Sequence, residues 1–278
     1  MTHPAPCLIV ALLALALPVT PLDAQTAPSA DEALAKIDAR LFFPDAQDGM
    51  SGYQAELSVW SGMAGTGGKI NPDPKGTKPA GKVEFRDGTK KQTDAAGAEV
   101  APGSFTPFCG PWTLTALMTF EVEWFAQPWS KRFAADAWSR ECSSEGSGTR
   151  LTLTPKQTIG EAFMLRPALV GLEVVLDAEG VPQTAVLKLD QKMMHDDGEA
   201  KFTFTEVGGK KRIARIENTL RSANLVIAPA LIFNFGKVGT CELPQMVEFR
   251  VPGGGLSGTM AGQDMITLVT WRYRAPPK

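Results

Sequence analysis

Histidine, cysteine and long apolar runs are scarce in this sequence, and each scarcity excludes a class of protein. The 278 residues include two histidines and four cysteines. No apolar run approaches the roughly 20 residues that a membrane-spanning helix requires. The cysteines are widely spaced and form no Cys-x-x-Cys pair of the kind that binds zinc. We therefore expect no membrane span, no metal and no cofactor.

Residues of the types that support catalysis do not assemble into a recognisable motif. Residues 195–199, His-Asp-Asp-Gly-Glu, have metal-binding side chains but also the composition of a hairpin turn. Glu121 and Glu123 lie on one side of a predicted strand without a catalytic partner. No Walker loop and no Gly-x-Ser-x-Gly motif occurs. We expect that the chain is not an enzyme.

The first residues have the layout of a secretory signal peptide. An apolar run, residues 7–17, ends at Pro18 and is followed by the small-residue cleavage motif Leu-Asp-Ala at residues 22–24. We predict that residues 1–24 are a signal peptide. The protein is then exported: it is periplasmic if the source is a two-membraned bacterium, and secreted otherwise.

Two details bear on processing at this end of the chain. Ala27 and Ala30 are also small, so cleavage after either residue is an alternative. Cys7 lies before the apolar core rather than at the cut, so lipid attachment through its thiol is not expected.

The mature chain is nearly neutral. Removal of residues 1–24 takes away one acidic residue, Asp23, and no basic one, so 28 basic and 29 acidic side chains remain. The tight basic cluster at residues 210–212 suits a solvated turn. A chain of this kind has no electrostatic field that would attract nucleic acid or an anionic membrane. Neither is expected as a partner.

Three cysteines remain after cleavage. An oxidising compartment favours one disulfide among them, and the simplest pair is Cys109 with Cys142. Cys241 is then buried or paired elsewhere. The sequence alone leaves the pairing open.

A short amphipathic helix is predicted at residues 31–43. Ser29 and Glu32 have the spacing of a capping box at its start, and Pro44 closes it. Between them, apolar residues recur at helical intervals: Leu34, Ile37 and Leu41.

Alternating polar and apolar residues predict strands along most of the remaining chain. The predicted strands are residues 53–59, 83–86, 151–154, 172–177, 184–189, 201–206, 212–217, 246–251 and 267–274. Residues 62–82 and 87–103 are polar or glycine-rich and are predicted to be loops. Residues 112–125 are expected to form a helix that gives way to an extended segment. Residues 225–235 are either a buried strand or a helix.

Successive short strands with tight turns indicate an antiparallel meander. We expect one domain over residues 25–278, mainly β (α+β). Its architecture is a curved antiparallel sheet or incomplete β-barrel, with helices covering the concave face.

The order of these segments resembles the periplasmic outer-membrane lipoprotein carrier and sorting family, a LolA-like group. The resemblance rests on the opening helix, on Leu243-Pro244 before a strand, and on four segments: Gly-Tyr-Gln-Ala-Glu-Leu at 52–57, Arg-Leu-Thr-Leu-Thr-Pro-Lys at 150–156, Leu-Glu-Val-Val-Leu-Asp at 172–177 and Lys-Phe-Thr-Phe-Thr at 201–205. Members have an incomplete β-barrel around an apolar cavity that helices close. No residue here matches the lid arginine of the carriers.

The resemblance implies non-enzymatic binding of an acyl chain, lipid or lipoprotein in that cavity. The implied lining is apolar: Leu57, Val59, Leu117, Phe120, Trp124, Leu151, Leu153, Leu172, Val174, Phe202, Phe204 and Phe249. Ordinary core is the competing interpretation, because any sheet with one buried face requires the same alternation. Two other functions stay open: an envelope protein-interaction or stress-sensing module of the same fold, and an unrecognised secreted hydrolase.

Overall fold

The structure is a computed structural model that describes residues 28–65, 68, 70, 72, 74–100, 124–157, 169–189, 198–222, 225–253 and 262–274. Several predictions concern residues outside this set. They are the signal peptide, most of the expected helix at residues 112–125 with Leu117 and Phe120, the turn with His195, and Cys109.

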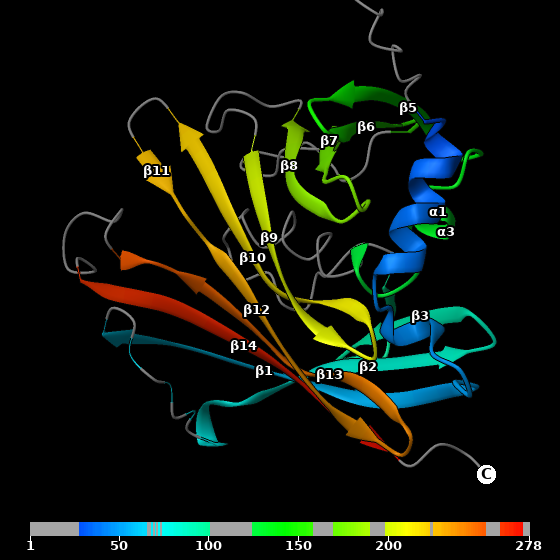
Figure 1. Cartoon of the computed structure of the whole chain (residues 1–278). Helices are drawn as coiled ribbons and strands as arrows, with labels where there is room; N and C mark the ends of the chain where they lie inside the picture. Colours follow the sequence, from blue (N-terminus) through cyan, green and yellow to red (C-terminus); the bar gives the residue numbers. More distant parts are fainter. Residues whose placement is uncertain are drawn as a thin grey trace, which may run out of the picture.

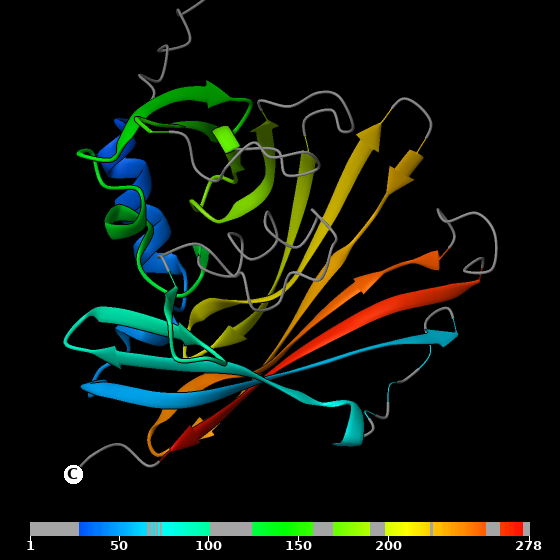
Figure 2. The same ribbon diagram turned by 180° about the vertical axis from the view of Figure 1, so that it is seen from behind.

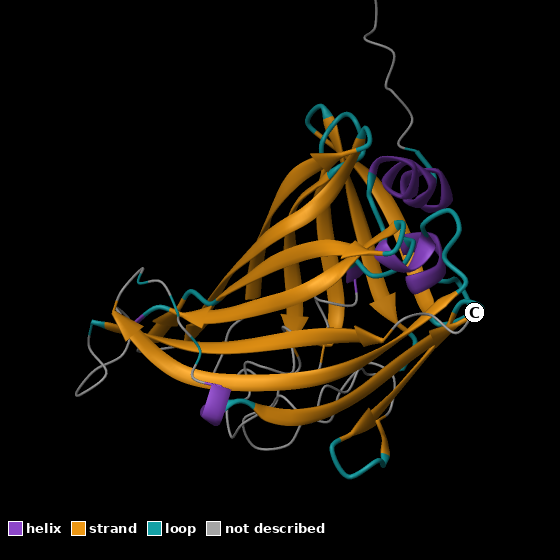
Figure 3. Cartoon of the chain, turned by 90° about the horizontal axis from the view of Figure 1, so that it is seen from below, coloured by secondary structure: helices purple, strands orange, loops and turns teal. Residues whose placement is uncertain are grey.

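One antiparallel sheet contains the described strands (Figure 1). Their bounds are β1 Gly52–Gly65, β2 Lys78–Arg86, β3 Thr89–Asp94, β4 Glu99–Val100, β5 Trp138–Glu145, β6 Gly148–Pro155, β7 Leu169–Leu176, β8 Pro182–Leu189, β9 Gly198–Val207, β10 Lys210–Ser222, β11 Leu225–Ile227, β12 Ala230–Val238, β13 Cys241–Val251 and β14 Gln263–Arg274. The neighbour order is β4-β3-β2-β1-β14-β13-β12-β10-β9-β8-β7-β6-β5, and β11 pairs with β10. The end strands β4 and β5 do not pair with each other, so the described sheet is not closed. A mainly β fold with a curved, open antiparallel sheet is confirmed (Figure 3).

The pairing of β1 with β14 joins the two ends of the domain. Its register runs from Gln54 opposite Arg274 to Gly65 opposite Gln263. The hairpin formed by β2 and β3 is attached to the rest of the sheet through this long-range contact. A strictly sequential meander would not contain it.

The structure corrects the loop predictions. Residues 87–103, predicted to be a loop, contain β3 and β4, and β1 and β2 extend into the expected loop at residues 62–82. Asp87 and Gly88 have φ of 48° and 78°, as a two-residue hairpin turn requires. Residues 225–235 form strands rather than a helix. Strand β5 was not predicted, because its alternate positions hold mostly Ser, Arg and Glu.

The predicted opening helix is confirmed as α1, Ala30–Arg40, but it ends before the predicted residue 43, because Leu41 is already in an extended conformation. Its capping box is present: Glu32 N donates to Ser29 Oγ (3.2 Å), and Ser29 N donates to Glu32 Oε2 (2.7 Å). Leu34 and Ile37 are fully buried. Local sequence and burial therefore agree on where this helix begins and which face it hides.

Asp38 of α1 forms hydrogen bonds with the start of the second described α-helix, α3, Trp129–Arg132. Its Oδ1 accepts from Trp129 N (2.6 Å) and its Oδ2 from Ser130 N (3.1 Å). Helix α1 contacts α3, β5, β6 and β10 and lies at one end of the sheet (Figure 2). Neither of these helices is long and apolar enough to cross a membrane.

Buried apolar side chains form two clusters. The larger one joins α1 and residues 124–138 to β6–β10, β12 and β13, and the smaller one joins β1 and β2 to Leu243 and Val269. Helix α1 packs at one end of the sheet. The prediction that helices cover the whole concave face is not tested by this packing and stays a prediction.

Candidate functional site

The predicted cavity-lining residues that belong to the described strands lie on one face of the sheet. Residues that pair across antiparallel strands point to the same side, so the register identifies that face. Three rows of pairs connect the strands: Val59–Val269–Val247–Phe233, Phe249–Leu231–Ile216–Phe202 and Ala200–Ala185–Val174–Leu151. Leu57, Leu153, Leu172 and Phe204 share this side by alternation or pairing. We call it the inner face.

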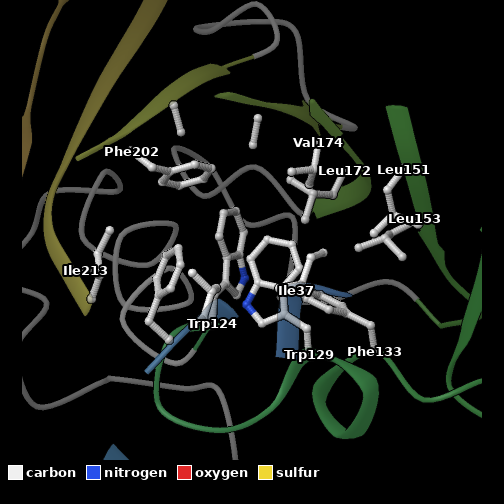
Figure 4. Packing of buried hydrophobic residues seen from close by; sticks show 14 of the residues in the cluster. Ile37, Trp124, Trp129, Phe133, Leu151, Leu153, Leu172, Val174, Phe202 and Ile213 are labelled. Carbon is white, nitrogen blue, oxygen red and sulfur yellow. The ribbon is translucent and has the colours of Figure 1, made fainter. Parts of the chain in front are cut away.

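The inner face of β6 and β7 is filled core. Four predicted residues there have no exposed surface: Leu151, Leu153, Leu172 and Val174. They belong to one cluster with Ile37, Trp129 and Phe133 (Figure 4). A ligand reaches these four residues only if that packing opens.

Aromatic rings continue the core onto β9. Trp124 is fully buried, and its ring lies edge-on to Phe202 with centroids 6.3 Å apart. Phe125 contacts both Phe202 (5.5 Å) and Phe204 (5.9 Å). Phe204 stays partly exposed, which marks the border of the filled region.

The inner face of β1 and β12–β14 is less completely covered by the described residues. Its partly exposed apolar residues, which we call the apolar strip, are Val59, Phe235, Phe249 and Trp271. Three charged side chains of β13 and β14 lie on the opposite face, where Arg250 donates to Glu248 (2.6 Å) and to Asp264 (3.0 Å). Arg250 and Asp264 are largely buried. This part of the sheet therefore has an apolar inner face and buried charges on its opposite face.

A small pocket adjoins the apolar strip where β1–β3 meet β12–β14. Its cavity volume is about 30 Å³, enough for one or two water molecules. Six of the residues that line it are aromatic: Tyr53, Phe125, Phe233, Phe235, Trp271 and Tyr273. Three others bring polar side chains: Asp45, Lys90 and Gln92.

The acidic and phenolic groups of this pocket have protein partners. The Tyr53 hydroxyl donates to Asp45 Oδ1 (3.0 Å), and Lys90 Nζ lies 3.6 Å from Asp45 Oδ2. The side chain of Asp45 is only 6% exposed, so these contacts offset the cost of removing its charge from water. The Tyr273 hydroxyl donates to Pro244 O (2.6 Å), and burial raises the pKa of Tyr273, which keeps it protonated.

Gln92 is the exception in the pocket. Its Nε2 is buried and has no hydrogen-bond partner in the described part of the chain. Buried amide N–H groups in folded proteins nearly always have an acceptor. This atom is thus a donor for which the described residues offer no acceptor.

Sequence alternation did not identify the polar pocket residues. Lys90 and Gln92 lie opposite Phe85 and Val83, at inner-face positions of β3 where alternation calls for apolar residues. Trp271 lies in a predicted strand, and its alternation with Val269 was a usable signal. For Asp45, which follows Pro44 in a short 3₁₀ turn, the sequence offered none.

The described residues hold no group of three or more His, Cys, Asp or Glu side chains placed to bind a metal ion. Cys142 and Cys241 form no disulfide with another described residue. Because Cys109 is not described, the predicted Cys109–Cys142 disulfide stays a prediction. Burial raises the pKa of the Cys142 thiol, which makes it a poor nucleophile.

Comparisons with known proteins add little to this geometry. No protein-family model and no curated protein sequence matches the chain. A crystal structure of MucB in complex with MucA(peri) is similar over 88% of this chain and 94% of that chain, with 11% identity and a TM-score of 0.19. A similarity at this level supports no conclusion about family or activity. The candidate site is therefore defined by the residues described above.

Proposed function

We propose that this protein binds an acyl chain, as part of a lipid or a lipoprotein, without catalysing a reaction. The observation that carries the proposal is the apolar strip, Val59, Phe235, Phe249 and Trp271, which stays partly exposed on a face that is filled core elsewhere. Each methylene buried there contributes about 0.8 kcal/mol to binding. About ten buried methylenes contribute about 8 kcal/mol, which is within the range of the free-energy cost of association.

The chemistry of the strip favours a hydrocarbon over a protein surface. Neighbouring inner-face positions on β13 and β14 hold Val247, Val251, Val269 and Met265, which are all apolar. At the Phe235 end of the strip, the Arg212 guanidinium lies 4.7 Å from the ring centroid and is paired with Glu242. Protein interfaces usually place polar groups around an apolar centre. A flexible hydrocarbon needs only an apolar surface to bind. The strip provides such a surface, so we prefer an acyl ligand to a protein partner.

Export, if residues 1–24 are removed as predicted, supplies a setting for this activity. In a two-membraned bacterium the protein would act in the periplasm, where acylated molecules must cross an aqueous space. A protein partner on the same face is the alternative function that the experiment below separates.

The test measures displacement of a fluorescent fatty acid, together with native mass spectrometry of protein purified from the envelope. The variant Phe249→Asp introduces a charge into the strip and should weaken acyl binding by about tenfold or more. Val170→Asp is the matched control, because Val170 of β7 is 36% exposed. If the wild type binds no acyl probe and carries no acyl species from the envelope, the proposal is wrong. Equal weakening by both variants contradicts it as well.

A further inference from the structure

We propose that Gln92 hydrogen-bonds the carbonyl oxygen of the bound acyl group, so that the protein selects ester- or amide-linked acyl chains over bare hydrocarbon. The inference rests on the proposed function and specifies its ligand. It starts from the buried Nε2 of Gln92, for which the described residues supply no acceptor.

The position of Gln92 is set by the sheet. It pairs with Val83 of β2 and with Val100 of β4, in the middle of a three-strand segment. Its backbone is held on both sides, which fixes the side of the sheet on which the Gln92 side chain lies. An unsatisfied donor at such a position has a free-energy cost that an incoming acceptor would remove.

The other polar groups around the pocket are already engaged. Asp45 accepts from Tyr53 and pairs with Lys90, while Tyr273 donates to Pro244 O. The cavity of about 30 Å³ has room for one oxygen atom of a ligand in place of water. Trp271 and Phe235 line the pocket and also belong to the apolar strip, so a chain lying on the strip can end at Gln92.

Charge decides which oxygen fits. Asp45 and Lys90 already form an ion pair in the same pocket, so a ligand carboxylate beside Gln92 would bury an additional charge, and removing that charge from water is costly. A neutral carbonyl accepts from Nε2 without that penalty. The pocket therefore favours an ester or amide carbonyl, the linkage of acylated lipids and lipoproteins, over a free fatty acid.

The test compares three probes of similar length, methyl laurate, lauric acid and tetradecane, as competitors of a fluorescent acyl probe. Because tetradecane leaves water more readily than methyl laurate, the test compares the change in affinity that a variant causes for each probe. Gln92→Met keeps the side chain's length and removes the amide, so it should weaken methyl laurate about five- to tenfold and leave tetradecane unchanged. Gln54→Met, at an exposed position of β1, is the control and should change neither.

Stability distinguishes this role from a structural one. If Gln92 serves ligand binding and not folding, Gln92→Met should leave the free energy of unfolding of the ligand-free protein unchanged or raise it. The substitution removes an unsatisfied buried donor. If Gln92→Met binds methyl laurate as tightly as the wild type does, the amide makes no bond to the ester carbonyl, and this inference alone is overturned. Failure of the wild type to bind any of the three probes would overturn the proposed function itself.

Discussion

The side-chain amide of Gln47 forms two hydrogen bonds with the main chain of Glu242, as the main chain of a neighbouring strand would. Glu242 N donates to Gln47 Oε1 (2.9 Å), and Gln47 Nε2 donates to Glu242 O (2.7 Å). The same Nε2 donates to Pro44 O (2.9 Å). One amide thus ties the segment after α1 to the start of β13, 195 residues away in the sequence.

Replacing this amide should destabilise the fold. Gln47→Ala leaves partly buried main-chain groups of Glu242 without partners, and the free energy of unfolding should fall by about 1–3 kcal/mol. Urea denaturation measures the change. Gln54→Ala, at an exposed position, should change stability by less than about 0.5 kcal/mol. An equal effect of both variants would contradict the role given to Gln47.

The link between the two helices should be measurable at Asp38. Asp38→Ala removes the acceptors of Trp129 N and Ser130 N and should cost about 1–2 kcal/mol, as the loss of a helix cap does. Asp38→Asn retains one acceptor and should cost less. Chemical denaturation followed by tryptophan fluorescence measures both, and Asp136→Ala at an exposed position is the control. A larger loss for Asn than for Ala would refute this assignment.

Core packing on β7 predicts a strong contrast between neighbouring residues. Leu172→Ala empties a fully buried site and should lower the free energy of unfolding by about 2–5 kcal/mol. Val170→Ala, two residues away and 36% exposed, should have an effect within about 0.5 kcal/mol. Thermal unfolding of both variants decides whether β7 packs as described.

The Cys142 thiol should make stability depend on alkaline pH. Burial raises its pKa in the folded protein, so the unfolded chain releases this proton first as pH rises. Its contribution is therefore complete below the ordinary thiol pKa of about 8.5 and is lost as pH climbs through the raised value. Unfolding of reduced protein between about pH 7 and 10 tests this. The decline should be smaller in Cys142→Ala, and identical profiles would contradict it.

Processing of the N-terminus is a direct test of export. If residues 1–24 are a signal peptide, the protein recovered from the envelope should begin at Gln25. N-terminal sequencing or intact mass measures this. A start at Pro28 or Asp31 would move the cut while keeping export, and recovery of the whole chain with Met1 in the cytoplasm would refute it.

Local patterns determined much of this fold. The spacing of Ser29 and Glu32 was enough to place the start of α1, because a capping box involves only residues three apart. Alternation was enough to assign Leu151, Leu153, Leu172 and Val174 to the buried face, because a strand has a period of two whatever it pairs with.

Tertiary structure alone decided which residues of that face are covered. Alternation cannot say whether an inner-face residue is core, like Leu172, or partly exposed, like Phe249, because exposure depends on which distant segments cover it. It also missed Lys90 and Gln92, polar residues on β3 whose inner positions matter only because β1–β3 meet β12–β14.

The sequence by itself therefore determined the secondary structure of most strands and the side of the sheet on which their apolar residues lie. The β1–β14 pairing, the bond of Gln47 with Glu242 and the pocket at Gln92 were decided only by tertiary structure. The physical reason is range: hydrophobic period and capping act within a few residues, whereas these three features join groups that only the folded chain brings together.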